Sequence, residues 1–222
     1  MICLPRSALC TSRRSRVSTR SAATIAALLF TVAFAVASLA HADAVSEIDR
    51  LAALMQWKEG TVVADIGAGD GSYSFAAARH VGESGKVIAT EIDSQKISEL
   101  RAEIKKRNLR NVLVEESKEA DTALPTGCCD AIFLRRVYHH LTKPVEFDAN
   151  LVRSLKSGGR LAIIDFPARS GLEPVEGVPA NRRGHGIPQK VVIEELTAAG
   201  LQVEKIVNDW PSDDYCVLFV KK

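Results

Sequence analysis

The sequence has few cysteines, and their spacing excludes two common uses of that residue. The 222 residues contain five: Cys3 and Cys10, the adjacent Cys128 and Cys129, and the distant Cys216. The last three form neither the framework of a disulfide-rich domain nor the ligand pattern of a zinc site. We therefore predict no metal site, and we expect these three to be small buried apolar residues on strands. A disulfide between Cys216 and one of the other two is the alternative.

Acidic residues and lysine are absent from residues 1–42. This segment carries five arginines, and residues 21–42 contain no Asp, Glu, Lys or Arg. A basic start, an apolar run and the small-x-small triplet "AHA" at 40–42 follow the order of a secretory signal peptide. We predict cleavage after Ala42, with Ala44 as the second choice, and a protein that is periplasmic or secreted.

Two alternatives for this segment remain open. The apolar run is just long enough to span a bilayer, so an uncleaved membrane anchor would also explain it. The protein would then contact the membrane only through its N-terminal segment. The abundance of Arg and Ser, together with the absence of acids, also fits an organelle transit peptide.

An excess of positive charge is absent from the rest of the chain. The full sequence has 29 Lys and Arg against 27 Asp and Glu, but five of those arginines lie in residues 1–42. Without them the balance is 24 against 27, a net charge of −3. This balance offers no basic footprint, so we predict no nucleic-acid partner. Residues 43–222 have the length and composition of one globular domain.

Short apolar runs alternate with helical patterns along this domain. The runs are Val62–Ile66, Val87–Ile92, Val112–Val114, Ala131–Leu134 and Leu161–Phe166. The alternation predicts a Rossmann-like α/β sheet of mostly parallel strands with helices on both faces. Two further runs near the C-terminus predict an antiparallel pair. One of the helices should begin at Pro144 and end at Gly158-Gly159.

The stretch "VVADIGAGDGSYS" carries three glycines between a predicted strand and a predicted helix. They are Gly67, Gly69 and Gly71, with Asp65 two residues before the first; Glu91 ends the next strand. Such a turn brings the backbone close to a nucleotide-like ligand, and an acid at the next strand end can accept both ribose hydroxyls. We therefore predict a nucleoside-binding site, with a purely structural turn as the alternative. A dinucleotide fingerprint would need glycine in place of Ser72, which disfavours an NAD-dependent oxidoreductase.

Four segments together resemble the class I S-adenosylmethionine-dependent methyltransferases. They are "VVADIGAGDGSYS", "GKVIATEID", "DAIFLRRVYHHL" and "RSLKSGGRLAIIDF", in the order that this family shows. The resemblance covers nearly all of residues 44–222 and is strongest to small-molecule enzymes of the ubiquinone and menaquinone biosynthesis type. It implies S-adenosyl-L-methionine as cofactor, methyl transfer to a small-molecule acceptor, and a seven-stranded sheet.

The resemblance also implies a role for individual residues in cofactor binding. The positions that match are Asp65, Gly67, Ala68, Gly69, Gly71, Glu91, Ile92, Glu116 and Ser117. The loop would pass under the methionine part of the cofactor, and Asp65 would orient the loop and the methionine amine. Glu91 would hold the ribose, while Ile92 would pack on the adenine. Many relatives carry Gly-Asp where this chain has Glu116-Ser117, so the usual acid at the adenine edge is displaced or absent.

Residues for the acceptor side are less explicit in the sequence. Displacement from a sulfonium needs mainly alignment and exclusion of water, and a base only where the acceptor must lose a proton. Candidate bases are Tyr138, His139 and His140, which follow the fourth predicted strand. Asp165 ends the fifth, so we expect Tyr138, His139 and Asp165 to line one crevice at the carboxyl ends of the strands. The segment 167–187 has four glycines, three prolines and no periodicity, and a connection of this length is often functional.

We interpret this segment as a lid that carries Arg182 and His185 towards the acceptor. The basic residues in it would bind an acidic group on the acceptor or, alternatively, form a solvated loop; they are Arg169, Arg182, Arg183 and His185. The proposed catalytic set is therefore His139, Tyr138 and His185.

The leader conflicts with a cofactor that is made in the cytosol. An exported enzyme, a membrane-anchored enzyme facing the cytosol, and an exported non-catalytic protein that binds a nucleoside ligand would each resolve the conflict. The twin arginine Arg13-Arg14 is a feature of signals for export of folded proteins, which would allow the cofactor to be carried out with the enzyme.

Overall fold

The computed structural model describes residues 45–169, 171–173, 175–182 and 185–222. The predicted leader and its cleavage sites lie outside the described residues, as does Arg183. In the described part of the chain, no helix is both long and apolar enough to cross a membrane.

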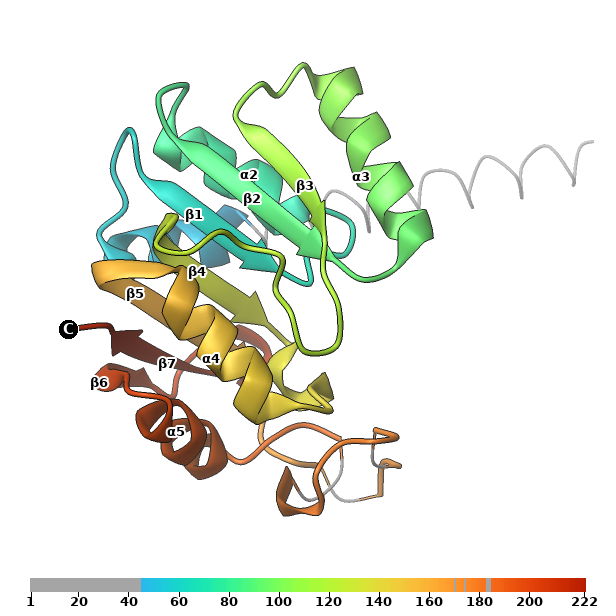
Figure 1. Ribbon diagram of the computed structural model, residues 1–222, viewed down its shortest axis with the longest axis vertical. Coiled ribbons are helices and arrows are strands. Elements are labelled where there is room, and N and C mark those ends of the chain that lie inside the picture. Colours follow the sequence, from blue (N-terminus) through green and yellow to red (C-terminus); the bar gives the residue numbers. More distant parts are fainter. Residues whose placement is uncertain (1–44, 170, 174, 183–184) are drawn as a thin grey trace, which may run out of the picture. The chain divides into compact units, whose positions relative to one another are not determined.

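Seven strands of the described chain form one sheet in the order β3-β2-β1-β4-β5-β7-β6 (Figure 1). The strands are β1 Val62–Ile66, β2 Lys86–Glu91, β3 Val112–Glu116, β4 Cys129–Arg135, β5 Leu155–Asp165, β6 Gln202–Val207 and β7 Tyr215–Val220. Strand β7 is antiparallel to both of its neighbours, and the other pairings are parallel. The predicted Rossmann-like sheet with an antiparallel strand near the C-terminus is confirmed.

Helices cover both faces of the sheet. They are the helical residues 45–55, α2 Ser72–Val81, α3 Ser94–Arg107, α4 Pro144–Ser154 and α5 Gln189–Ala198. Helices α4 and α5 lie over the face drawn towards the viewer in Figure 1, while α2 lies behind the sheet. Successive strand residues point to opposite faces, so Ile132 of β4 belongs to the core under α4 and α5, and Phe133 to the core under α2. Because strands β1 to β5 run parallel, their carboxyl ends meet at one edge of the sheet.

Helix α4 ends earlier than the glycine pair predicts. It stops at Ser154, and Gly158-Gly159 lies within β5. There the pairing with β4 is irregular, because Leu155 pairs with Cys129 whereas Arg160 pairs with Ala131. A Cβ atom on Gly159 would lie 2.9 Å from a backbone oxygen, so this irregular turn leaves no room for a side chain.

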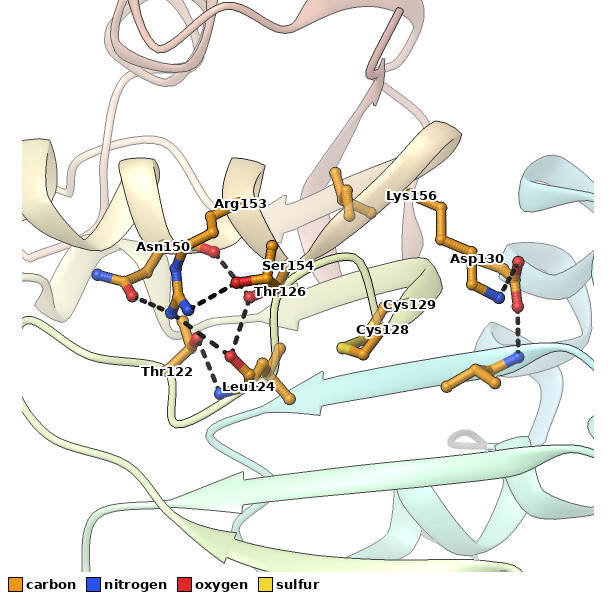
Figure 2. The surroundings of a disulfide bond; sticks show 12 residues. Thr122, Leu124, Thr126, Cys128, Cys129, Asp130, Asn150, Arg153, Ser154 and Lys156 are labelled. Carbon is orange, nitrogen blue, oxygen red and sulfur yellow. Dashed lines mark hydrogen bonds and ion pairs between the residues drawn. A yellow bond between two sulfur atoms is a disulfide. The ribbon is translucent and has the colours of Figure 1, made fainter.

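The predicted burial on a strand is confirmed for Cys129 and Cys216 and is wrong for Cys128, which is half-buried and precedes β4. The prediction did not include a disulfide between the two adjacent cysteines. Cys128 and Cys129 are joined by a disulfide bond between adjacent residues at the start of β4 (Figure 2). Cys216 is a buried free cysteine on β7. The alternative pairing with Cys216 is therefore also wrong.

This disulfide predicts a specific pattern of thiol labelling. In denatured protein from an oxidising compartment, reduction should make two more thiols available to iodoacetamide, counted by mass spectrometry. Cys216→Ser should lower the count by one both before and after reduction. Equal counts before and after reduction would contradict the pairing.

Candidate functional site

The glycines after β1 build a backbone turn that side chains would block. Gly67, Gly69 and Gly71 have φ angles of +70°, +57° and +79°, a region that glycine adopts without steric cost. A Cβ on Gly67 would lie 2.6 Å from Val137, and one on Gly71 would lie 2.5 Å from Leu100. A Cβ on Gly69 would instead meet no atom closer than 4.0 Å. Packing within the chain thus explains the outer two glycines, and Gly69 leaves open space for a ligand.

Glu91 connects this turn to the end of β2. Its carboxylate accepts hydrogen bonds from the backbone N–H groups of Gly69 (3.0 Å), Ile92 (2.8 Å) and Asp93 (3.1 Å). Hydrogen bonds to a charged acceptor are strong and directional, so these three donors fix the orientation of the carboxylate. Glu91 is therefore held ready at the strand end where the sequence predicts a ribose-binding acid.

A cavity of about 500 Å³ lies beside Glu91, at the carboxyl ends of the parallel strands. Its lining includes Gly67, Glu91, Ile92, Ser117, Glu119, Arg136 and His140. The volume lies within the usual range for small-molecule sites, and this edge of the sheet is where ligands bind in open α/β folds. The Ile92 side chain, in a residue that is 56% exposed, offers an apolar surface for a planar ring.

A larger hollow of about 680 Å³ lies near the turn that follows α3. The Asn111 side chain in its lining donates hydrogen bonds to the carbonyl oxygens of Ala78 and Gly82, so it serves to hold the fold. This hollow lies away from the carboxyl ends of the strands. We therefore assign the cofactor to the cavity beside Glu91.

Asp65 lies beneath the glycine turn and is not part of the cavity lining. It is 3% exposed and accepts a hydrogen bond of 2.6 Å from the Ser74 hydroxyl on α2. Burial raises the pKa of this carboxyl to about 7; the Ser74 hydrogen bond and Arg135 oppose the rise, whereas the Asp70 and Glu91 carboxylates add to it. The geometry thus fits orientation of the loop. Contact with the cofactor stays a prediction.

Ala68 belongs to the turn, but its side chain is buried beneath it. It is 8% exposed, and it packs in a small apolar cluster with Phe75, Ala89 and Leu100. Its methyl group therefore stabilises the loop against α2 and α3.

Of the two residues predicted at the adenine edge, Ser117 and Glu116, only Ser117 lines the cavity. Ser117 lines the cavity, and its N–H donates to the carbonyl oxygen of Glu91, 2.9 Å away. Glu116 is exposed and lies outside the lining. Glu119 supplies an acid to the lining and pairs with Lys143 at 3.3 Å. Glu119, which sequence reasoning missed, is therefore the acid that this segment places in the cavity lining, three residues beyond Glu116.

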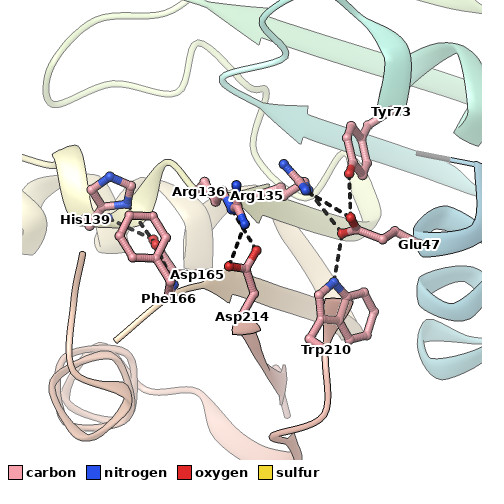
Figure 3. Close-up of polar contacts among 9 residues, drawn as sticks. All are labelled: Glu47, Tyr73, Arg135, Arg136, His139, Asp165, Phe166, Trp210 and Asp214. Carbon is pink, nitrogen blue, oxygen red and sulfur yellow. Dashed lines mark hydrogen bonds and ion pairs between the residues drawn. The ribbon is translucent and has the colours of Figure 1, made fainter. Parts of the chain in front are cut away.

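Two arginines at the end of β4 were also missed, although "RR" directly after an apolar strand is a visible signal. Arg135 donates two hydrogen bonds to Glu47, of 3.0 and 2.9 Å, and Arg136 donates two to Asp214, of 2.8 and 2.9 Å (Figure 3). Glu47 belongs to the helical residues 45–55 and also accepts from Tyr73 and Trp210. Arg135 and Arg136 both line the cofactor cavity, so these ion pairs connect it to Glu47 near the start of the domain and to Asp214 near its end.

Three histidines meet next to this cavity. His139 is 2% exposed, and its Nδ1 lies 2.8 Å from Oδ1 of Asp165, which is fully buried (Figure 3). The rings of His140 and His185 lie with centroids 4.0 and 5.0 Å from that of His139. Burial and the other two imidazoles lower the pKa of His140 to about 4, so this ring is neutral at pH 7. The predicted grouping of His139, Asp165 and His185 is therefore present in the structure.

Tyr138 lies away from this group. It is fully buried, and its hydroxyl lies 2.9 Å from carboxylate oxygens of both Asp148 and Glu195. Burial and these two acids raise the pKa of Tyr138 far above its usual value. The structure thus makes Tyr138 a packing residue between α4 and α5, and it does not support the predicted role as a base.

Arg182 does not reach towards an acceptor either. It is 1% exposed and donates hydrogen bonds to the carbonyl oxygen of Tyr138 (2.6 Å) and to Glu195 (2.9 Å). The predicted direction of this side chain is wrong, because the partly buried Glu195 carboxylate on α5 binds the guanidinium. Arg182 anchors the long loop to the body of the domain.

The loop itself lies at the predicted edge of the sheet. Its two ends pair through hydrogen bonds of 2.9 Å, from Arg169 N–H to the His185 carbonyl and from Ile187 N–H to the Phe166 carbonyl. Val175 lines the cofactor cavity. Other loop residues line an adjacent cavity of about 330 Å³; its lining is Arg136, His139, His140, Phe166, Arg169, Leu172 and His185. The position expected of a lid is confirmed, and its closure stays a prediction.

Comparison with known proteins supports the same assignment. A family model described as "Methyltransferase domain" matches residues 57–192, more than half of the chain. The chain belongs to the class I S-adenosylmethionine-dependent methyltransferases. A crystal structure of an S-adenosylmethionine-dependent methyltransferase from Aquifex aeolicus is 29% identical, with a TM-score of 0.67 over 79% of this chain and 89% of that one. S-adenosylmethionine is the cofactor that this membership assigns to the methyltransferase domain.

Two curated methyltransferases show how far the likeness extends. A ubiquinone/menaquinone biosynthesis C-methyltransferase from Erwinia tasmaniensis is 26% identical over 53% of this chain and 47% of its own length. The 27-O-demethylrifamycin SV methyltransferase from Amycolatopsis mediterranei is 27% identical over 70% of this chain and 59% of its own length. The chain thus spans about half the length of the curated relatives it matches.

The buried Asp65 predicts a pH dependence of stability in the absence of cofactor. An Asp in the unfolded chain ionises near pH 3.9, whereas Asp65 in the folded protein keeps its proton up to about pH 7. The contribution of Asp65 to the free energy of unfolding is therefore greatest below pH 3.9 and is lost as the pH rises through about 7. Asp65→Asn cannot ionise. The free energy of unfolding of Asp65→Asn relative to wild type should therefore rise between pH 5 and pH 8. The rise should be roughly 2–3 kcal/mol, because about two pH units separate pH 5 from the folded pKa and each contributes about 1.4 kcal/mol.

Urea unfolding at the two pH values measures this difference. Asp213→Asn changes an exposed acid and should show no such trend. A difference between wild type and Asp65→Asn that stays constant from pH 5 to pH 8 would show that Asp65 is already ionised at pH 5 in the folded protein, and would contradict the prediction.

Proposed function

We propose that this domain transfers a methyl group from S-adenosylmethionine to a small-molecule acceptor. The proposal rests on the observation that two neighbouring cavities share lining residues. Arg136 and His140 line both the cofactor cavity beside Glu91 and the histidine-lined cavity under the long loop. A cofactor in the first cavity would therefore present its reactive end to a molecule in the second.

The residues of the chain act mainly by alignment. Bound S-adenosylmethionine supplies a methyl group that is already activated on a sulfonium. Glu91 would accept the ribose hydroxyls, Ile92 would support the adenine, and the turn at Gly69 would admit the methionine part. Holding both reactants in line can contribute several kcal/mol to catalysis without any covalent role for the protein.

The second cavity limits the acceptor to a small molecule. At about 330 Å³ it combines the aromatic ring of Phe166 and the apolar Leu172 with imidazoles and Arg169. The Arg169 guanidinium lies 4.7 Å from the centre of the Phe166 ring and keeps its positive charge there, so it could bind a polar or anionic group of the acceptor. A compact acceptor with one polar group fits this lining best.

We also propose that the protein is exported. The order of charge and hydropathy in residues 1–42 supports this, as does the disulfide between Cys128 and Cys129, because disulfides persist mainly in oxidising compartments. The same features favour a second candidate, an exported protein of this fold that binds the cofactor without turnover.

Cofactor binding tests the part of the proposal that both candidates share, namely the site for S-adenosylmethionine. Calorimetry should show that the purified protein binds S-adenosylhomocysteine and has no affinity for NADH. Glu91→Ala should weaken binding by about 1–3 kcal/mol, the cost of leaving buried polar groups unpaired. Gly69→Val should abolish it by filling the space above the turn and straining the backbone. Glu99→Ala, an exposed acid on α3, is the control and should bind as wild type does. Affinity for NADH alone would refute the proposal.

Export has its own test. Protein from the periplasm or medium should begin near Asp43 when its N-terminus is sequenced. An intact N-terminus in the membrane fraction would favour an anchor, and full-length protein in the soluble cytosol would contradict both.

A further inference from the structure

We propose that His139, His140 and His185 together bind one divalent transition-metal ion, and that Zn²⁺ fits this site. The proposal differs from the prediction made from sequence spacing, which gave no metal site. It arises because the fold brings a loop residue next to two residues that follow β4. The binding of the ion stands without the proposed function, whereas its use in catalysis rests on it.

The ligand atoms are close enough to share an ion after small side-chain rotations. One ring nitrogen from each histidine lies within 4.8 Å of those of the other two. Two nitrogens bound to a tetrahedral zinc ion at about 2.0–2.1 Å are about 3.3 Å apart. The approach of roughly 1.5 Å falls to His140 and His185, because His139 is held by Asp165. Among the described residues, neither of these two rings has a hydrogen-bond partner.

His139 has the arrangement that metal-binding histidines commonly show. Its Nδ1 lies 2.8 Å from Asp165, and Asp165 also accepts from the N–H groups of His139 (3.1 Å) and Phe166 (2.9 Å). A fixed carboxylate on one ring nitrogen keeps the proton there and turns the lone pair of the other towards a metal.

The second nitrogen of His139 supplies an independent indication of a ligand. Nε2 is buried and has no hydrogen-bond partner among the described residues, in a ring that is itself 98% buried. A buried polar atom without a partner is costly, and native proteins rarely leave one unused. A metal ion between the three rings would satisfy it.

The ligand set selects the class of ion. Three neutral imidazoles suit zinc, copper, iron or nickel, whereas magnesium and calcium prefer oxygen ligands. Three histidines with a fourth position left open are also the arrangement of catalytic zinc rather than of structural zinc. All three histidines line the same cavity as Phe166 and Leu172, so a fourth ligand of a bound ion would come from this cavity.

This position suits an ion that holds the acceptor. His140 lines both cavities, so the ion lies between the place of the cofactor and that of the acceptor. An acceptor hydroxyl bound at the open position would lose its proton to solvent, because a bound metal ion lowers the pKa of an oxygen ligand. The oxygen electron pair then forms the bond to the methyl carbon, the carbon–sulfur bond breaks, and its electrons remain on the sulfur of neutral S-adenosylhomocysteine. The acceptor class is therefore a small hydroxylated molecule.

Titration of the metal-free protein with Zn²⁺ and with Co²⁺ tests the site. Calorimetry should give one Zn²⁺ per chain, and Co²⁺ should show the visible absorption of a four-coordinate ion. His140→Ala and His185→Ala should each weaken binding at least about tenfold, and Asp165→Asn should weaken it about 10–100-fold as a positioning residue. The control is His80→Ala, which removes a histidine of α2 that pairs with Asp49 and should leave binding unchanged. Acetohydroxamate should alter the Co²⁺ spectrum by occupying the open position.

Each outcome decides one part of the account. Absence of stoichiometric binding, or equal weakening by His80→Ala and His185→Ala, would overturn the metal site. Thermal unfolding of every variant identifies any loss of metal binding that comes from misfolding. His140→Ala carries the least risk of misfolding, because His140 is an exposed residue. A protein that binds S-adenosylhomocysteine but no metal would keep the proposed function and lose this inference. A protein that binds Zn²⁺ but not S-adenosylhomocysteine would do the reverse.

Discussion

The geometry of the cofactor site depends on the hydrogen bonds that the Glu91 carboxylate accepts from the backbone. Three backbone N–H groups hold it, one from the glycine turn after β1 and two from the residues that follow β2. This connection fixes the distance between the two strand ends and leaves the cavity open between them. The turn can come so close because Gly67 and Gly71 have no side chains, and Gly69 leaves the remaining space free.

The second part of the site depends on another buried carboxylate, at the end of β5. Asp165 orients His139, and the long loop brings His185 to the same ring. The loop can do so because Arg182 is anchored on Glu195 and because the two loop ends pair with each other. The parallel strands therefore present two acids at one edge, Glu91 for the cofactor and Asp165 for the histidine group. This division of the edge gives the cofactor cavity and the histidine-lined cavity separate anchoring acids.

The fold and the cofactor side were predictable because both depend on local backbone requirements. Alternating apolar runs define the strands, and the glycines of the turn are needed for positive φ angles that the pattern reveals. The acceptor side depends on contacts between distant segments, which no local pattern reports. Arg182 is an example, because its partner Glu195 lies on a helix that packs against the loop only in the folded chain. The same holds for Tyr138, whose residue type suggests chemistry while its burial between α4 and α5 excludes it.

Two further differences have a similar origin. The adjacent cysteines have no spacing that indicates a pair, yet the start of β4 brings them together. The Gly158-Gly159 pair is a usual signal for the end of a helix, but here it serves an irregular turn inside β5. The histidine cluster was visible only as two separate observations, "HH" after the fourth strand and one histidine in a loop without periodicity. Only the fold brings the three rings together.

A crystal structure of the protein with S-adenosylhomocysteine tests the central claim most directly. The account predicts both ribose hydroxyls on Glu91, the adenine against Ile92, the methionine part over Gly69, and the sulfur towards His140. A ligand bound in the hollow near Asn111, or bound beside the glycine turn without contact to Glu91, would contradict it.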